Sequence, residues 1–168
     1  MPESPLPRIL ICCEYATLNG GEHSLLAALR LLAGEIFDFV AAVPPQGPLG
    51  AELASINIPT LPLNLRNTEN QKLSPAEVNS ALSDVIKEAK PNLIHANSLA
   101  MGRMLGRIAP EFEIPMTAHL RDIRLSEPAI SDLNQLDRLI AVSEATCKYH
   151  VKRGLAAERT TVFTTALT

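Results

Sequence analysis

The sequence predicts an α/β domain with a doubly wound, mostly parallel sheet and helices on both faces. Short, nearly continuous apolar runs of strand length alternate with longer segments whose apolar residues recur every three or four positions. Prolines, glycines and polar clusters separate these segments. With 168 residues, 46% of them hydrophobic, the chain can bury a core of its own, so we expect residues 1–168 to form one domain.

The first strand and helix are the most clearly marked. The apolar run at residues 8–14 is typical of a strand buried on both faces, and we expect it to be the central strand. Two glycines follow it and lead into a helical pattern that ends near residue 33. Asn19 is placed to cap this helix, with Glu22 three residues later reaching back to the cap.

The same alternation continues to the carboxyl end. The segment 59–63 contains two prolines and is expected at a sheet edge or in a loop. Residues 64–73 are polar and lack periodicity, so we expect a mobile surface loop there. The remaining strands are expected at 37–43, 93–96, 115–119 and 138–142, and the remaining helices at 49–56, 74–90, 98–108, 128–136 and 143–153.

Charge and cysteine content exclude several classes of function. The net charge of −3, from 18 acidic and 15 basic residues, is too weak to attract nucleic acid across the surface. No apolar run approaches the roughly 18 residues that span a bilayer, and no leader pattern begins the chain, so we expect a cytoplasmic protein, with peripheral association at the inner membrane face as a further option. Cys12, Cys13 and Cys147 are not spaced as a disulfide or metal framework, and we expect buried thiols and no metal or cofactor.

Candidate ligand-binding residues follow the expected strands, because ligands of such sheets bind at the carboxyl ends of the strands. Gly20 and Gly21 join the first strand to its helix, where backbone amides can approach an anion that the helix end already favours. The pair lacks the glycine spacing of dinucleotide binders and the Lys-Ser/Thr of a P-loop. A turn that only solves a packing problem is the alternative interpretation.

A second candidate group follows the strand at 115–119. His119, Arg121 and Asp122 place an imidazole, a guanidinium and a carboxylate within four positions. Arg121 is suited to clamp a phosphate or carboxylate, His119 to donate to an oxygen, and Asp122 to orient either neighbour. A local Arg121–Asp122 surface pair with an inert His119 is the alternative.

Weaker candidates follow two other strands. Asn97 and Ser98 could contact an acceptor hydroxyl, although capping the next helix is the favoured interpretation of this pair. Ser143 has the same two interpretations. His95 lies inside its strand, where a buried, hydrogen-bonded side chain is favoured over a ligand. His23 and His150 lie on expected helices and receive no role.

Taken together, these segments resemble the amino-terminal Rossmann-like domain of retaining glycosyltransferases of the family-four type, which have the GT-B fold. No single motif is specific, but the order and spacing of the set cover nearly the whole chain. The matching segments are residues 8–14, 20–25, 91–97, 114–122, 136–145 and 153–155.

The resemblance implies a sugar transfer from a nucleotide-sugar donor to a glycan or lipid-linked acceptor, with retention of configuration. It implies that Gly20 and Gly21, with Glu22 in the same motif, lie beside the donor diphosphate or the acceptor. It also implies that His119 faces the transferred sugar with Arg121 and Asp122 beside it. Departure of a nucleoside diphosphate develops negative charge, which amides, a helix end and a guanidinium stabilise.

The resemblance also implies a partner that the 168 residues lack. In that family the nucleotide is gripped by a Lys/Arg pair and two spaced glutamates of a carboxyl-terminal domain. The segment that usually joins the domains ends in Asn-Gly-x-Asp, whereas residues 164–168 read Thr-Thr-Ala-Leu-Thr. We therefore expect the amino-terminal, acceptor-side half of a two-domain enzyme, inactive when isolated. The alternative is a non-catalytic Rossmann-like binding module, and a nicotinamide oxidoreductase is disfavoured because its glycine fingerprint is absent.

Overall fold

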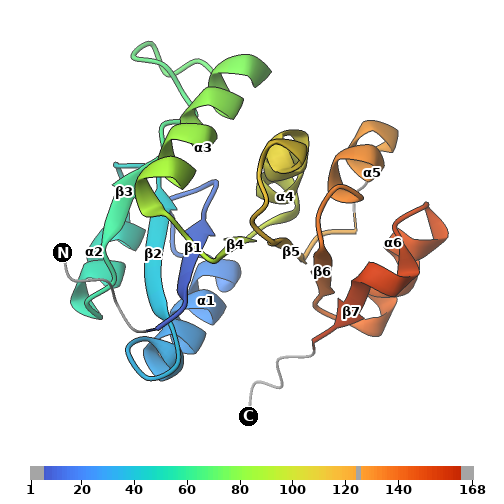
Figure 1. The fold of residues 1–168 in the computed structure, drawn as a ribbon, viewed down its shortest axis with the longest axis horizontal. Coiled ribbons are helices and arrows are strands. Elements are labelled where there is room, and N and C mark those ends of the chain that lie inside the picture. The colour runs from blue at the N-terminus through green and yellow to red at the C-terminus, as the bar shows by residue number, and fades with distance from the viewer. Residues whose placement is uncertain (1–5, 124–125, 164–168) are drawn as a thin grey trace.

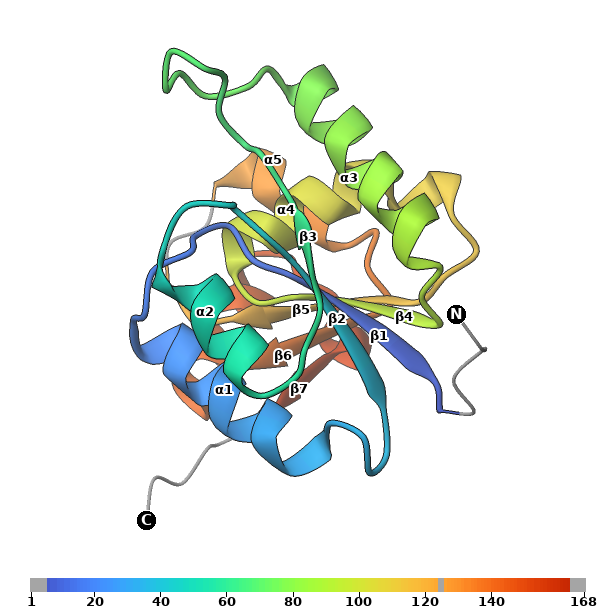
Figure 2. The same cartoon turned by 90° about the vertical axis from the view of Figure 1, so that its left-hand side faces the viewer.

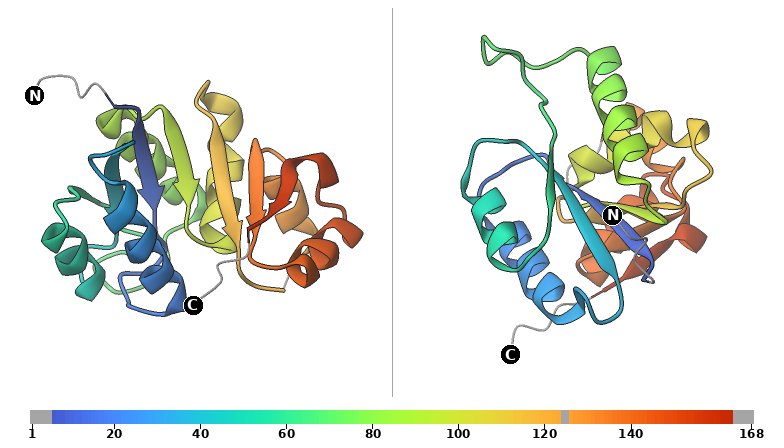
Figure 3. Two further views of the ribbon diagram at one scale, coloured as in Figure 1. Left: turned by 90° about the horizontal axis from the view of Figure 1, so that it is seen from below. Right: turned by 60° about the vertical axis from the view of Figure 1, so that its left-hand side comes forward.

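The computed structural model describes residues 6–123 and 126–163, and within them seven parallel strands form one sheet. The sheet order is β3-β2-β1-β4-β5-β6-β7 (Figure 1). All strands run the same way, as the left view of Figure 3 shows. The strands are β1 (Arg8–Cys12), β2 (Asp38–Val43), β3 (Thr60–Pro62), β4 (Leu93–Ala96), β5 (Met116–Leu120), β6 (Arg138–Ala141) and β7 (Thr160–Val162).

Helices cover both faces of this sheet (Figures 1 and 2). Helices α1 and α2 pack on one face, whereas α3, α4 and α5 pack on the other, and α6 lies against β6 and β7. The helices are α1 (Gly20–Leu32), α2 (Pro48–Ser55), α3 (Pro75–Ala89), α4 (Leu99–Ile108), α5 (Glu127–Leu133) and α6 (Glu144–Lys152).

Strand β1 contributes side chains to the hydrophobic cores on both faces of the sheet. Successive side chains of a strand point to opposite faces, so a strand buried on both faces must be apolar throughout. Leu10 and Cys12 enter the core beneath α3 and α4, while Ile9, Ile11 and Cys13 enter the core beneath α1 and α2. All five residues are buried. The predicted doubly wound α/β fold is confirmed, and the apolar run predicted at residues 8–14 supplies the interior strand β1 (Arg8–Cys12), which lies between β2 and β4; the middle strand of the seven is β4.

Most element boundaries also agree with the sequence patterns. Ser74, Ser98 and Ser143 are the residues that precede α3, α4 and α6, and each accepts a hydrogen bond from a backbone amide of the first helical turn. Gly154 follows the end of α6 with a φ of 108°, a left-handed conformation that glycine adopts readily. Strand β7 was not predicted, because its Thr160-Thr161-Val162 sequence is too short and too polar to show a period.

The segment at residues 64–73 forms a hairpin that projects from the body of the domain beside α3 (Figure 2). Arg66 and Lys72 are antiparallel partners in it, and the backbone amide of Leu73 donates to the carbonyl of Leu65 at 3.1 Å. The side chain of Asn67 accepts bonds from the amides of Glu69 and Gln71 at 3.0 and 2.9 Å, which closes the turn. The mobility of this segment stays a prediction.

Candidate functional site

The strand order reverses direction between β1 and β4, and this is where a doubly wound sheet opens a crevice. The loop after β1 leads to α1 on one face, and the loop after β4 leads to α4 on the other. Residues from three loops meet at this edge, and we call Gly21, Asn97, His119 and Arg121 the switch-point cluster. Of the candidates from the sequence, these are the four that the structure brings into mutual contact.

Asn97 fixes the position of Arg121. Its backbone amide donates to the carbonyl of Cys12 at 3.0 Å, which ties the end of β4 to the end of β1. Its side-chain oxygen accepts from Nη2 of Arg121 at 3.1 Å, and its backbone carbonyl accepts from Nε at 3.4 Å. Asn97 is only 3% exposed, so its side chain serves to hold the guanidinium. Within the described residues no ion pair joins Arg121 to Asp122, so the alternative interpretation, a local Arg121–Asp122 pair, is not what forms.

Gly21 allows the guanidinium to lie against the start of α1. A Cβ at Gly21 would stand 3.3 Å from Nε of Arg121, whereas a Cβ at Gly20 would meet nothing within 4 Å. The two glycines of the motif therefore differ: Gly21 makes room for a cation, and Gly20 leaves the helix end open. A positive side chain lies against the first turn of α1, where the partial positive charge of the helix N-terminus also favours an anion.

The two histidines of the site are neutral at physiological pH. Burial first, and then the charge of Arg121, lower the pKa of His95 to about 4. The same causes and the neighbouring His95 lower the pKa of His119 to about 4. The two rings are in edge-to-face contact with centroids 5.8 Å apart. His95 is hydrogen-bonded as expected, since its Nδ1 lies 2.8 Å from Oγ1 of Thr117.

The tautomer of His119 follows from its neighbour. Nη2 of Arg121 lies 3.4 Å from Nδ1 of His119, and a guanidinium can only donate. Nδ1 is then the acceptor, and the one proton of the neutral ring is on Nε2. His119 therefore offers an N–H donor to a ligand rather than a base.

Arg121 is half-buried, and two acidic side chains affect its charge. Burial lowers the pKa of its guanidinium, while Glu22 and Asp122 oppose that shift. Cys13 lies close by, and burial, followed by the charge of Glu22, raises the pKa of its thiol to about 12, so it stays protonated. Glu22 and Asp122 therefore help Arg121 to keep its positive charge.

The other sequence candidates lie around the cluster without joining it. Glu22 accepts the backbone amide of Asn19 at 3.0 Å, as the capping pattern predicted. Ser98 and Ser143 accept from the amides of Met101 and Thr146, each at 3.1 Å, which is the capping interpretation. The side chain of Asp122 is exposed.

His150 is a contributor that the sequence patterns did not reveal. It is 0% exposed, and its Nε2 lies 2.7 Å from the carbonyl oxygen of Asp122, so Nε2–H donates to that carbonyl. This bond fixes the backbone directly after Arg121. Because 28 residues separate the two groups, no local spacing could have indicated it.

A cleft of about 980 Å³ lies beside the cluster, between the loops after β1 and β2 and the 64–73 hairpin. Tyr15 stands on the β1 side of this cleft and is 57% exposed. Glu14 raises the pKa of the Tyr15 phenol through a hydrogen bond and through its charge, Arg66 lowers that pKa, and Asp122 raises it. Tyr15 and Glu14, which follow β1, share this cleft with residues of the loop after β2 and of the hairpin. No helix in the described ranges is long and apolar enough to cross a membrane.

Solved structures share this fold. The protein HepE of Anabaena, in complex with UDP and glucose, superposes with a TM-score of 0.76 at 19% identity, over 94% of this chain and 44% of that one. The lipopolysaccharide outer core galactosyltransferase WaaB superposes at 0.71 with 13% identity, over 92% and 44%. The chain has the fold of a GT-B amino-terminal domain.

The same fold also occurs outside the transferases. A UDP-GlcNAc 2-epimerase from Neisseria meningitidis, bound to UDP-GlcNAc, superposes at 0.63 with 16% identity, over 92% of this chain and 46% of that one. This chain thus spans less than half the length of the structures it matches. No family model and no curated protein matches the sequence.

Proposed function

We propose that the chain is the acceptor-side half of a retaining glycosyltransferase that uses a uridine nucleotide sugar. The observation that carries this proposal is the placement of Arg121, half-buried at the switch point, bonded to Asn97 and seated against Gly21 at the start of α1. A guanidinium and free helix amides aimed at one space suit a diphosphate. The similarity in fold to structures solved with UDP supports the choice of nucleotide.

In the proposed reaction the bond between the sugar C1 and the diphosphate oxygen breaks, and the electron pair leaves with the diphosphate. Arg121 and the amides of Gly20 and Gly21 would stabilise that developing charge. His119 would donate its Nε2–H to an oxygen of the sugar. The acceptor hydroxyl would attack the same face of C1 and pass its proton to a donor phosphate oxygen, so no protein nucleophile is needed.

The proposal is tested by following backbone amide NMR shifts while UDP-glucose is added to the purified chain. We expect weak binding with shifts at Gly21, Asn97 and Arg121, and no release of glucose or UDP. Arg121→Gln should raise the dissociation constant about tenfold, because it removes a charge-assisted bond to phosphate. Arg138→Gln is the control. Arg138 is exposed at the start of β6, whereas the switch-point cluster lies at the carboxyl ends of the strands.

Turnover of UDP-glucose by the purified chain would contradict the proposal that a second domain is required. Equal binding by Arg121→Gln and the wild type would remove Arg121 from the site. Because an epimerase shares the fold, joining the chain to a second domain and asking whether UDP release depends on an added acceptor separates transfer from epimerisation.

A further inference from the structure

The hairpin at 64–73 places two basic residues directly opposite each other. Arg66 and Lys72 are antiparallel partners, and the bonds beside them run from the Leu73 amide to the Leu65 carbonyl and from the Asn67 amide to the Gln71 carbonyl. This pattern makes Arg66 and Lys72 a pair without mutual backbone hydrogen bonds, the arrangement in which opposed side chains approach most closely. Like charges in that position destabilise a strand pair.

The described part of the chain offers no ion-pair partner to either residue of this pair. Within residues 6–123 and 126–163 neither Arg66 nor Lys72 makes an ion pair. One guanidinium nitrogen of Arg66, Nη1, donates to the carbonyl of Asn70 at 2.7 Å, which holds the side chain in place and leaves its other donors available. The unfavourable pairing therefore persists in the free protein.

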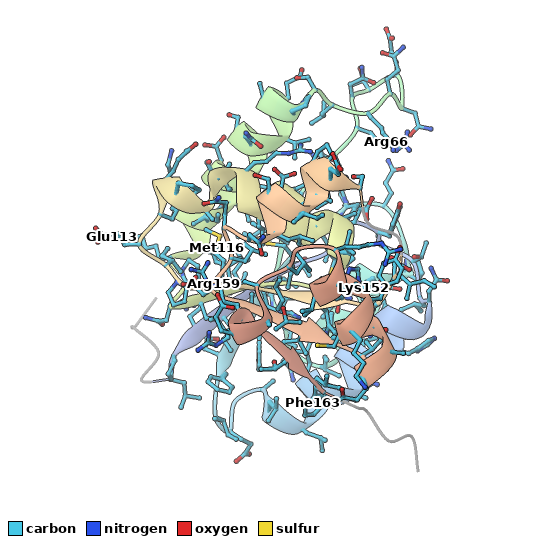
Figure 4. All side chains as sticks on the ribbon, turned by 90° about the vertical axis from the view of Figure 1, so that its right-hand side faces the viewer. Arg66, Glu113, Met116, Lys152, Arg159 and Phe163 are labelled. Carbon is cyan, nitrogen blue, oxygen red and sulfur yellow. The ribbon has the colours of Figure 1, made fainter. Side chains whose placement is uncertain are left out.

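Both side chains face the cleft. Arg66 and Lys72 line it together with Tyr15 of the loop after β1. Figure 4 shows Arg66 on the projecting hairpin and labels Lys152 at the end of α6 and Arg159 just before β7 for comparison. The cleft is lined below the cations by apolar side chains of Leu65, Leu73, Val78 and Met104.

We propose that Arg66 and Lys72 bind a phosphate group carried by the acceptor. This inference rests on the proposed function, because it treats the cleft as the place where the acceptor lies next to the switch-point cluster. A phosphate between the two cations turns an unfavourable pair into two charge-assisted interactions. The guanidinium supplies a fork for two phosphate oxygens, and the ammonium adds a point charge.

Binding is measured with two phosphorylated probes and their uncharged counterparts. Geranyl phosphate and geraniol test a phosphate on an apolar chain, and glucose 6-phosphate and glucose test a phosphate on a sugar. We expect at least one phosphorylated probe to shift the amides of residues 65–73 and to bind about tenfold more tightly than its uncharged counterpart. Because apolar side chains line the cleft, we expect geranyl phosphate to bind more tightly than glucose 6-phosphate.

The double variant Arg66→Gln with Lys72→Gln should weaken that binding about tenfold while leaving the UDP-glucose shifts at Gly21 and Arg121 unchanged. The matched control, Lys87→Gln with Arg138→Gln, removes the same charge at two exposed positions, in the last turn of α3 and at the start of β6, and should bind like the wild type. Lys72→Glu should raise the thermal midpoint of the free protein, because it replaces repulsion by attraction, and should abolish phosphate binding.

The two proposals fail in different ways. Equal binding of charged and uncharged probes, or equal weakening by the control pair, would overturn the phosphate assignment and leave donor binding at Arg121 untouched. A phosphorylated probe that shifts the switch-point cluster instead of residues 65–73 would also overturn it. A wild-type chain that shows no binding of UDP-glucose would instead refute the proposed function.

Discussion

The switch-point cluster and the hairpin hold their cations in different ways. Arg121 directly follows β5, is half-buried, and makes two hydrogen bonds to the buried Asn97, so its position is set by the sheet. Arg66 and Lys72 are exposed on a hairpin outside the sheet and are pinned only by contacts within the hairpin. A fixed charge suits a reacting group, and a charge on a projecting hairpin suits recognition of a ligand that differs among related proteins.

The largest effect is expected at the contact between the loops after β1 and β2, both of which line the cleft. Gly47 lies in the loop after β2 with a φ of 141°, and a Cβ there would stand 2.5 Å from the carbonyl oxygen of Ala16 in the loop after β1. Gly47→Ala should therefore lower the free energy of unfolding by about 3 kcal/mol, from backbone strain and a clash with backbone atoms. Chemical denaturation measures the change.

Gly50→Ala is the matched control, because Gly50 lies inside α2 and a Cβ there would meet nothing within 4 Å. It should stabilise the protein by about 0.5–1 kcal/mol through helix propensity. If Gly47→Ala were as stable as the wild type, the two loops would not be coupled in the way the structure indicates, and the cleft could change shape independently of the cluster.

The sequence predicted one of these regions far better than the other. Residues directly after a buried strand are easy to find, because the strand is marked by its apolar run, and this located His119, Arg121, Gly21 and Asn97. The specific contacts were not predictable: Asn97 was expected to face an acceptor or cap a helix, and it holds Arg121 instead. That pairing depends on how β4 and β5 lie side by side, which no local pattern encodes.

Residues 64–73 were predicted to form a mobile surface loop because the segment is polar and shows no periodicity. One signal was present: Leu65-Arg66 and Lys72-Leu73 mirror each other around an asparagine-rich turn, which is the pattern of a short hairpin. His150 shows the complementary limit. Its bond to the Asp122 carbonyl joins α6 to the loop after β5, and only the tertiary structure reveals it.

A second prediction concerns the neutral histidines of the cluster. The pKa of His95 is about 4 in the folded chain and near 6.5 in the unfolded one. Between these values the unfolded chain binds a proton that the folded chain refuses, so stability falls as pH drops from 6.5 to 4 and is fully present above 6.5. Comparing wild type with His95→Asn, which removes this titration, should show about 2 kcal/mol less pH dependence in the variant over that window.

Proton NMR of the imidazole rings checks the same point directly. His95 and His119 should both titrate with midpoints near pH 4. A midpoint near 6.5 for His119 would mean that its ring is charged when a ligand binds at pH 6, and the role of an N–H donor from a neutral ring would be wrong. In the stability measurement carboxylates titrate over the same pH range. The informative quantity there is therefore the difference in the free energy of unfolding between His95→Asn and the wild type.

The smallest expected effect separates the two glycines of the α1 turn. Gly21→Ala would press on Nε of Arg121, the same atom that donates to the Asn97 carbonyl, so the guanidinium cannot retreat without lengthening that bond. We expect UDP-glucose binding to weaken about fivefold, equivalent to about 1 kcal/mol. Gly20→Ala makes the same chemical change one residue earlier with no neighbour within 4 Å, so its binding should stay within about twofold of the wild type.

Both substitutions remove the same freedom from the unfolded chain, so the difference between them reports on Arg121 alone. If Gly21→Ala and Gly20→Ala bound UDP-glucose equally well, the close approach of Arg121 to α1 would be a packing detail. The anion would then be held by the helix amides without the guanidinium. A fivefold difference confined to Gly21→Ala would instead establish that the position of Arg121, set by Asn97 on one side and by the missing Cβ on the other, governs donor binding.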